Sequence, residues 1–461
     1  MVILLTHGYF INADAQEKRI MKPYVPLGIL HIAAYLEERG ISVSVFDSTF
    51  SSLENFSEEL SKIKPTVVGI YINMMTKFNA LKMIRIAKAS NATVIIGGPE
   101  PTFYAPEYIA AGADLIVVGE GEITILEVLN ELQNPTPDFS RVDGLIYQDA
   151  RGKIHRTAQR AFISDLDTLP LPARKKVRLQ DYTKFWKQRH GYSSLSLITM
   201  RGCPFTCKWC SHAVYGESYR RRSPKLVVDE IELLVHEYHP NRLWFADDVF
   251  TINHKWFFDF SQQVCDRKLS IQYDCITRAD RLNEQVIASL ARTGCTTLWI
   301  GGESGSQNIL DAMARDVRVE QIQAMTALAQ THGIEVGMFV MFGYPGETAN
   351  DVELTIEHVR KSKPDFLLTT TAYPIKGTRF YDEAASLFQE PTLPFEEWND
   401  RMIALRREKS NRFYWFAHRR IVNESLAVKH ASGKHKHIGK FMLSKAKATI
   451  ARLGMIGSSG I

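Results

Sequence analysis

Short apolar runs alternate with segments of helical periodicity along residues 1–132, and this alternation restricts the fold more than any other feature. Between the first two runs, LGILHIAAYLEERG places apolar residues at helical spacing and ends at Gly40, a typical helix C-cap. The apolar runs are MVILLTHGYF, ISVSVFDS, PTVVGIYI, ATVIIGGP and ADLIVVGEGE. Continuous apolar strands that alternate with helices form parallel sheets covered on both faces. We therefore expect an α/β fold in which residues 1–132 form an N-terminal, Rossmann-like, doubly wound parallel sheet.

The carboxyl ends of these strands, where doubly wound sheets bind their ligands, are rich in glycine. Glycine lets a bulky ligand approach the backbone closely. The strand ends read His7-Gly8, Asp47-Ser48, Ile72-Asn73, Gly97-Gly98-Pro99 and Gly119-Glu120-Gly121-Glu122. These ends predict a ligand site in the N-terminal domain.

A second series of strands and helices is expected over residues 190–385, after a Pro-rich linker and hairpin at 133–189. Its strand candidates are SLSLITM, RLWFADD, SIQYDCI, TTLWIGGES, EVGMFVMFG and FLLTTTAY. Six strands with intervening helices suit a partial (β/α)6 barrel, with an active site at the strand carboxyl ends. Residues 386–461 then turn helical and basic, and we expect them to form a helical C-terminal cap on the barrel.

Composition narrows the class of protein. Apolar residues make up 45% and charged residues 23% of the 461-residue chain, which is ordinary for globular proteins and argues against disorder. The net charge of +5 is mild for this length and demands neither nucleic acid nor membrane as a partner. The chain has no apolar run of transmembrane length, and its first residues read as a strand instead of a signal peptide. We therefore expect a cytoplasmic protein.

The cysteines are concentrated in the middle of the chain, where Cys203, Cys207 and Cys210 follow the strand SLSLITM in a C-x3-C-x2-C pattern. All six cysteines lie between residues 203 and 295, which favours metal or redox chemistry over a disulfide scaffold. Structural zinc usually takes four ligands, and no second C-x2-C pair exists. A four-iron cluster held by three thiolates keeps an open position on one iron, where chemistry can occur. The alternatives are zinc or a loop without metal.

The cysteine pattern after the first barrel strand resembles that of radical S-adenosylmethionine (SAM) enzymes, and Trp209 supplies the aromatic residue that the signature places before its third cysteine. The resemblance implies a [4Fe–4S] cluster on Cys203, Cys207 and Cys210, whose open iron chelates SAM. It also implies reductive cleavage of SAM to a 5′-deoxyadenosyl radical. The residues implied to contact SAM are Trp209, Asp247, Asp248, Arg278, Glu303, Ser304 and Gly343.

Each SAM contact has a structural alternative. Asp247 and Asp248 in FADDVF stand where many members have Gly-Gly-Glu, and either could instead cap the next helix. Arg278 could bind the SAM carboxylate or form a surface salt bridge. Glu303 and Ser304 in WIGGESGS suit the ribose hydroxyls or the SAM amine. The turn GYPGET, with Gly343, could shape the adenine site or serve only as a tight turn before a helix.

The N-terminal domain resembles the cobalamin-binding domain that precedes the radical SAM domain in one large subclass. The matching segments are VPLGILHIAAYLEERG, PTVVGI, VIIGGPEPTF and DLIVVGEGE. The resemblance implies cobalamin beside Gly97, Gly98, Gly119, Glu120 and Gly121. The chain lacks an Asp-x-His-x-x-Gly segment, so we expect no histidine ligand below the cobalt; a domain without corrinoid is the alternative. The chain has no cysteine before Cys203, which argues against a methylthiotransferase.

The resemblance implies a cobalamin-dependent radical SAM enzyme that methylates an unactivated carbon of a small molecule, a tetrapyrrole or a lipid. The alternatives are a radical oxidative cyclisation or ring rearrangement with the same cofactors, or a non-catalytic iron–sulfur sensor. An electron donor such as flavodoxin or ferredoxin is implied, and no nucleic acid is expected. Residues 401–461 contain fourteen Lys or Arg and two acids. This basic C-terminus predicts a solvated cap, with an anionic substrate or peripheral membrane contact as the alternatives.

Overall fold

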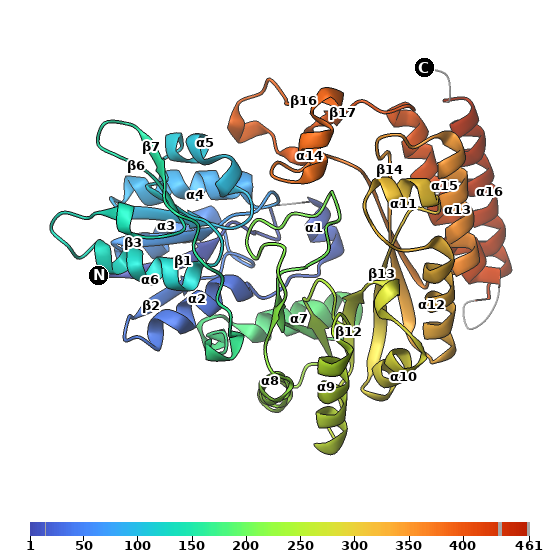
Figure 1. The fold of residues 1–461 in the computed structure, drawn as a ribbon, viewed down its shortest axis with the longest axis horizontal. Coiled ribbons are helices and arrows are strands. Elements are labelled where there is room, and N and C mark those ends of the chain that lie inside the picture. The colour runs from blue at the N-terminus through green and yellow to red at the C-terminus, as the bar shows by residue number, and fades with distance from the viewer. Residues whose placement is uncertain (14, 432–435, 459–461) are drawn as a thin grey trace. The chain divides into compact units, whose positions relative to one another are not determined.

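The computed structural model describes residues 1–13, 15–431 and 436–458 (Figure 1). The chain divides into two compact units, which are described separately. The first comprises Met1–Pro204, Ser211–Trp244 and Thr392–Asp400, and the second comprises Phe205–Cys210, Phe245–Pro391 and Arg401–Ile461. Within the described ranges, no helix combines the length and apolar character that crossing a membrane requires.

The first unit is built on a seven-stranded sheet in the order β2-β1-β3-β4-β5-β6-β7. Its strands are β1 (Ile3–His7), β2 (Val43–Phe46), β3 (Val67–Tyr71), β4 (Thr93–Gly97), β5 (Leu115–Val117), β6 (Leu145–Gln148) and β7 (Ile154–Arg156). The first five strands pair in parallel, and the chain order reverses at β1, which lies between β2 and β3. The predicted doubly wound parallel sheet is therefore confirmed, and the hairpin β6–β7 extends it in antiparallel fashion.

The helices of the first unit either connect these strands or follow them along the chain. They are α1 (Ala15–Ile20), α2 (Leu27–Glu37), α3 (Leu53–Ile63), α4 (Lys77–Ala89), α5 (Ala105–Ala110), α6 (Gly121–Glu131), α7 (Leu179–His190) and α8 (Pro224–Tyr238). The further strands are β8 (Ser194–Leu197), β9 (Met200–Arg201), β10 (Arg220–Arg221) and β11 (Arg242–Phe245), of which Phe245 belongs to the second unit. Helix α3 begins where the Ser52 hydroxyl accepts the Asn55 N–H and ends at Lys64 in a left-handed conformation.

The second unit contains four parallel strands in the order β12-β13-β14-β15. The strands are β12 (Tyr273–Thr277), β13 (Cys295–Glu303), β14 (Glu335–Phe342) and β15 (Phe366–Thr371), and the helices are α9 (His254–Asp266), α10 (Glu284–Arg292), α11 (Gln307–Ala312), α12 (Val319–Thr331) and α13 (Ala349–Ser362). Together with β8 and β11, these are the six strands predicted for the barrel domain. The predicted fold class is confirmed.

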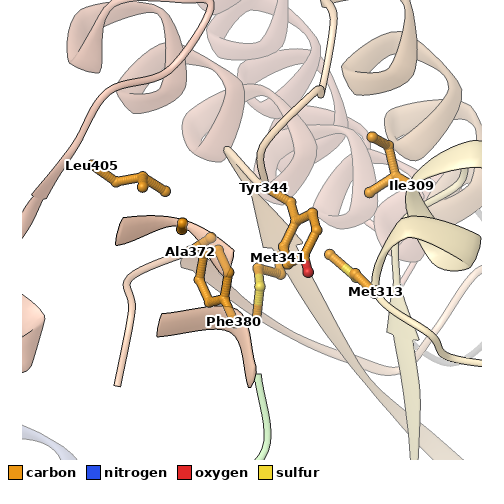
Figure 2. Close-up of a cluster of buried hydrophobic side chains, with 8 residues drawn as sticks. Ile309, Met313, Met341, Tyr344, Ala372, Phe380 and Leu405 are labelled. Atoms are coloured by element: carbon orange, nitrogen blue, oxygen red, sulfur yellow. The ribbon is translucent and has the colours of Figure 1, made fainter. Parts of the chain in front are cut away.

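The chain beyond β15 forms α14 (Arg379–Glu383), β16 (Phe388–Gln389), β17 (Ala404–Leu405), α15 (Asn411–Ala431) and α16 (Ile438–Ile456). The last two helices pack side by side and confirm a helical C-terminal region (Figure 1). A buried apolar cluster joins this region to the strand ends: the rings of Tyr344 and Phe380 stack 4.9 Å apart, beside Met341 and Leu405 (Figure 2). Trp209 packs against the same cluster and anchors the cysteine loop.

Candidate functional site

The Cys207 sulfur lies among cationic side chains. It accepts hydrogen bonds from Arg278 Nη1 at 3.5 Å and from Arg315 Nη1 at 3.6 Å, and both arginines are buried. A hydrogen bond with the Cys210 thiol and the positive charges of Arg315 and Arg278 lower the pKa of Cys207 to about 5, although burial opposes the shift. The same pairing and burial raise the pKa of Cys210. Cys207 is thus held as a thiolate, the form that ligates metal.

A cation–π contact, an ion pair and a hydrogen bond to a backbone carbonyl fix Arg278 in place. The Arg278 guanidinium lies 3.7 Å from the centre of the Phe205 ring, and its Nε donates to Asp280 Oδ1 at 2.8 Å. Its Nη2 donates to the Arg315 carbonyl at 2.7 Å. Arg278 is therefore engaged with the cysteine loop, and its predicted role as partner of the SAM carboxylate stays a prediction.

Arg315 escaped prediction from the sequence. It follows α11 in a tight turn in which Ala314 and Asp316 both adopt left-handed backbone conformations, with φ of 51° each. Its guanidinium lies 5.8 Å from the centre of the Trp209 ring and 3.8 Å from the Glu303 carboxylate. The only signal in the sequence is an arginine directly after an apolar helical run, a pattern that fits any helix end.

A bulge at the end of β13 aims Glu303 at Arg315. The register between β13 and β14 shifts between Gly301 and Glu303, and Glu303 has a left-handed φ of 40°. A Cβ at Gly301 would lie 2.1 Å from the Arg315 guanidinium, so this glycine makes room for the pair. Burial raises the pKa of Glu303 to about 6. When ionised, this buried carboxylate can accept a hydrogen bond from an amine such as that of SAM.

The remaining predicted SAM contacts differ in their surroundings. Ser304 is fully buried, where its hydroxyl lies 3.1 Å from the Thr355 hydroxyl and accepts the Ser306 N–H. It therefore supports the turn after β13. Asp247 is buried while Asp248 is exposed, so the two adjacent carboxylates face different environments.

Gly343 begins the turn after β14 with a φ of 72°, which favours glycine. Its N–H donates to Glu347 Oε2 at 2.6 Å, and its carbonyl accepts from Arg407 Nε at 3.3 Å. Arg407 also donates to the Ala372 carbonyl at 2.6 Å and so ties the turn to the end of β15. Burial raises the pKa of Glu347 to about 8. Arg407 was not predicted, because nothing in its basic surroundings distinguishes it from other cations.

All five glycine-turn residues predicted for cobalamin line one pocket of the first unit. A second hollow adjoins it, and Gly28, Tyr71 and Tyr215 line both. The first pocket is lined by Leu5, Gly28, Ile29, Ile32, Gly69, Ile70, Tyr71, Ile95, Ile96, Gly97, Gly98, Val117, Gly119, Glu120, Gly121, Glu122, Ile125, Val214 and Tyr215. Such an apolar, glycine-rich wall at the carboxyl ends of parallel strands suits a large, flat ligand.

Two glycines of this pocket play opposite roles. Gly98 has a φ of 118°, and a Cβ there would lie 2.1 Å from the Ile72 carbonyl, so the backbone itself requires glycine. Gly28, near the start of α2, has no heavy atom within 4 Å of its missing Cβ. Its side of the helix therefore faces open space that a ligand can fill. Gly28 was not among the predicted residues, although VPLG opens the segment from which the cobalamin resemblance was drawn.

The carboxylates of the pocket wall are already paired. Glu120 accepts from Arg201 Nη1 and from Arg220 Nη1, each at 2.7 Å, and from the Ile163 N–H at 2.9 Å. Arg201 also bonds Glu122. The predicted residue Glu120 thus holds two arginines and a loop N–H at the pocket wall, and its place at a cobalamin site stays a prediction.

The N-terminal domain contains two histidines, His7 and His31, and both are buried. His7 Nε2 lies 3.1 Å from Asp47 Oδ1, while its Nδ1 accepts the Tyr9 N–H at 3.3 Å. His31 is buried outside the first pocket, and burial lowers its pKa well below the ordinary value. Whether a histidine ligates the cobalt from below stays a prediction from the sequence.

Two of the three predicted cluster ligands lie close together. Within the described residues, no group of three or more His, Cys, Asp or Glu side chains converges closely enough to hold one metal ion. A four-iron cluster binds each thiolate on a separate iron. The structure brings Cys207 and Cys210 together under two arginines. Cys203 belongs to the first unit, and its role as the third ligand stays a prediction.

Comparisons with known proteins match both halves of the chain. Family models for the B12 binding domain and the radical SAM superfamily match residues 20–129 and 197–359. The uncharacterized methyltransferase PH0819 of Pyrococcus horikoshii is 30% identical over 368 residues, 78% of each chain. The anaerobic magnesium-protoporphyrin IX monomethyl ester cyclase of Rubrivivax gelatinosus is 26% identical over 87% of this chain and 72% of its own.

Solved structures share the fold over the whole chain. The radical SAM methyltransferase TsrM from Kitasatospora setae, with cobalamin and a [4Fe–4S] cluster bound, has a TM-score of 0.74 at 17% identity and covers 99% of both chains. The cobalamin-dependent radical enzyme OxsB, with aqua-cobalamin bound, has a TM-score of 0.79 at 15% identity and covers 99% of this chain and 72% of its own.

Proposed function

The chain belongs to the radical SAM superfamily and carries a B12 binding domain, and from this premise we propose that it is a cobalamin-dependent radical SAM methyltransferase. The resemblance predicted from the sequence is confirmed, as is its assignment as an enzyme whose cofactors are a [4Fe–4S] cluster, SAM and cobalamin. When bound, these groups supply an electron that cleaves SAM and a carrier for its methyl group. The observation that carries the proposal is the presence, in one chain, of a glycine-walled pocket and a thiolate under two arginines.

The residues of the cysteine loop have distinct proposed roles. Cys203, Cys207 and Cys210 ligate the cluster, and Arg278 and Arg315 stabilise the thiolate charge. Trp209 contributes a wall of the SAM site. The further proposed SAM contacts are Asp247, Asp248, Glu303 and the Gly343 turn, with Ser304 supporting them from within the fold.

The cobalamin site relies on backbone shape. Gly97, Gly98, Gly119 and Gly121 line the proposed corrinoid pocket at the strand ends, and Gly28 leaves open space at α2. Glu120 holds the wall through Arg201 and Arg220. A ligand bound in this way is recognised by its outline, because the pocket lining is largely aliphatic.

The substrate is proposed to be a small molecule, tetrapyrrole or lipid, and the electron donor a flavodoxin or ferredoxin. We also propose that the protein has no nucleic acid partner and that it is located in the cytoplasm. Radical oxidative cyclisation is the second candidate, because the Rubrivivax cyclase matches 87% of this chain. The two candidates differ in whether the SAM methyl group reaches the product.

Isotope labelling separates the candidates. The anaerobically reconstituted enzyme would be incubated with a reductant, SAM carrying a trideuterated methyl group, and an extract containing lipids and tetrapyrroles. We expect 5′-deoxyadenosine together with an extract component that gains the label. A product that lost hydrogen without gaining label would favour cyclisation, and absence of 5′-deoxyadenosine from every incubation would contradict the proposal.

A further inference from the structure

Helix α16 exposes apolar side chains that a water-facing helix would not normally carry. Among the large apolar side chains of the described residues, the six most exposed all belong to this helix, with 55–72% of their surface accessible. They are Ile438, Met442, Leu443, Ile450, Leu453 and Ile456. Isolated exposed apolar residues are ordinary, but six on one helix mark a surface that contacts something.

The exposed apolar residues occupy the side of α16 opposite its packed face. The packed face consists of the small residues Ser444, Ala448 and Ala451 together with Met455, all buried as the helix packs on α15. At about 100° per residue, the six exposed side chains fall within an arc of about 140° centred opposite this buried row. The inner side of the helix is therefore buried by its packing on α15. The six exposed residues form a second, separate apolar face on the outer side.

Cations flank the outer face on both sides. The same helical geometry places Lys440 and Lys447 along one edge and Lys445 and Arg452 along the other. Lys445 pairs with Glu424 at 2.9 Å, and Glu424 is the last acidic residue in the chain. An apolar strip between two cationic edges, with no acid beyond residue 424, is complementary to an anionic surface with an apolar interior.

Helix α15 extends this surface with a tryptophan. Trp415 is 49% exposed, and Arg419 lies 3.8 Å from the centre of its ring. Its neighbour Phe416 packs against Gly454 of α16, where a Cβ would lie 2.4 Å from the Phe416 ring. Trp415 therefore lies on α15 one residue before a contact with the C-terminal part of α16. Tryptophan and arginine are typical of the boundary between lipid headgroups and acyl chains.

From these observations we propose that the outer face of α16, with Trp415, docks the enzyme on the surface of an anionic lipid bilayer. The helix lies in the plane of the interface, since the charges along its edges prevent it from spanning. A second copy of the chain suits the face less well, because a two-fold contact would bring cationic edges against cationic edges. The proposal does not depend on which reaction the enzyme catalyses.

Vesicle sedimentation tests the proposal with the full-length, cofactor-loaded protein. The probes are vesicles of phosphatidylcholine alone and vesicles with about one third phosphatidylglycerol. We expect binding to the anionic vesicles, at least ten-fold weaker binding to the neutral ones, and weakening at high salt. Absence of binding to the anionic vesicles would overturn the proposal.

Variants distinguish binding through the outer face of α16 from non-specific adsorption of the protein to vesicles. Ile450→Ser, Leu453→Ser and Ile456→Ser together should weaken binding to anionic vesicles at least ten-fold, while corrinoid and iron–sulfur absorption stay unchanged. The matched control is Leu354→Ser, which removes an exposed leucine from α13 and should leave binding intact. Equal binding of the triple variant and the natural chain would overturn the proposal. A dimer that dissociates in the triple variant, without vesicle binding by the natural chain, would assign the face to a second copy and also overturn it.

Discussion

The cysteine loop and the glycine-walled pocket differ in the side chains that surround them: those around the loop are charged, and those around the pocket are largely apolar. Around Cys207, two buried arginines and the buried Glu303 concentrate charge within a few ångströms of a thiolate. Around Gly28 and Gly98, the lining is mainly aliphatic, and the nearby carboxylates are neutralised by arginines within the wall. From this difference we expect that removing a charge impairs function at the first site, whereas adding side-chain volume impairs ligand binding at the second.

Loss of a cluster ligand should have the largest effect. Cys207→Ala removes the thiolate on which Arg278 and Arg315 converge, so neither the cluster nor reductive SAM cleavage should survive. We expect loss of the iron–sulfur absorption shoulder and at least a hundred-fold fall in 5′-deoxyadenosine formation. Corrinoid uptake should remain normal, because its pocket is not built from these residues.

Two variants serve as controls for this prediction. Cys207→Ser keeps an acceptor for the arginines but provides no thiolate, so it should fold better than Cys207→Ala and still lack the cluster. Cys265→Ala removes a cysteine of α9 outside the loop and should keep the full absorption. A cluster retained in both Cys207 variants would contradict the assignment.

Added volume in the pocket should have the next largest effect. Gly28→Leu places a side chain in space that is free of protein atoms, so the helix should tolerate it while corrinoid binding falls about ten- to hundred-fold. Equilibrium titration with cobalamin, followed by absorbance, measures the loss. The iron–sulfur shoulder should be unchanged, which makes this variant the converse of Cys207→Ala.

Gly28→Ala is the matched control for pocket volume. It should bind cobalamin nearly normally and stabilise the fold by a few tenths to about 1 kcal/mol, because alanine is the better helix former. Equal cobalamin affinity of Gly28→Leu and the natural chain would show that this part of the pocket does not receive the corrinoid.

The contrast also explains what could be predicted from the sequence. Cys203, Cys207 and Cys210 are recognisable as candidate ligands because they lie in one short loop with a characteristic spacing. Gly97, Gly98 and the turn at 119–122 are recognisable because strand ends and glycines are both local signals. The parallel sheet followed from alternating periodicity in the same way.

Residues that act across long sequence separations were not predictable. Arg315 reaches Cys207 over 108 positions, and Arg407 reaches Gly343 over 64. A lone arginine carries no spacing signal, so only packing reveals its partner. The converse also holds: Ser304 and Glu120 occupy recognisable positions, yet the fold uses their side chains internally.

Removal of one loop arginine should have an intermediate effect. Arg315→Met keeps side-chain volume but withdraws a positive charge from Cys207 and leaves Glu303 without its cation. We expect a cluster that still assembles but supports about ten-fold slower SAM cleavage, since a charged hydrogen bond contributes about 1.5–3 kcal/mol. Single-turnover formation of 5′-deoxyadenosine measures the rate.

The double variant Arg315→Met/Glu303→Gln separates the two consequences. If the unpaired Glu303 carboxylate causes part of the loss, neutralising it should restore part of the rate. If Cys207 alone matters, the double and single variants should be equal. If Arg315→Met cleaved SAM at the natural rate, the positive charge of Arg315 would not be important for this site.

A pH effect on stability alone is expected from the buried carboxyl group beneath the Gly343 turn. Burial raises the pKa of Glu347 to about 8, well above its ordinary value, so the folded protein keeps a proton that the unfolded chain releases near pH 4.5. The contribution of this group to the free energy of unfolding is complete below that pH and is lost as pH rises toward about 8, by on the order of a few kcal/mol.

Glu347→Gln imitates the protonated group and should lose no stability over this window. Urea unfolding at pH 5, 7 and 9 should therefore show the variant gaining on the natural chain as pH rises, with Glu357→Gln on the exposed side of α13 as the control. Parallel pH dependence of the two proteins would show that Glu347 is ionised throughout and that this part of the second unit does not bury a neutral acid.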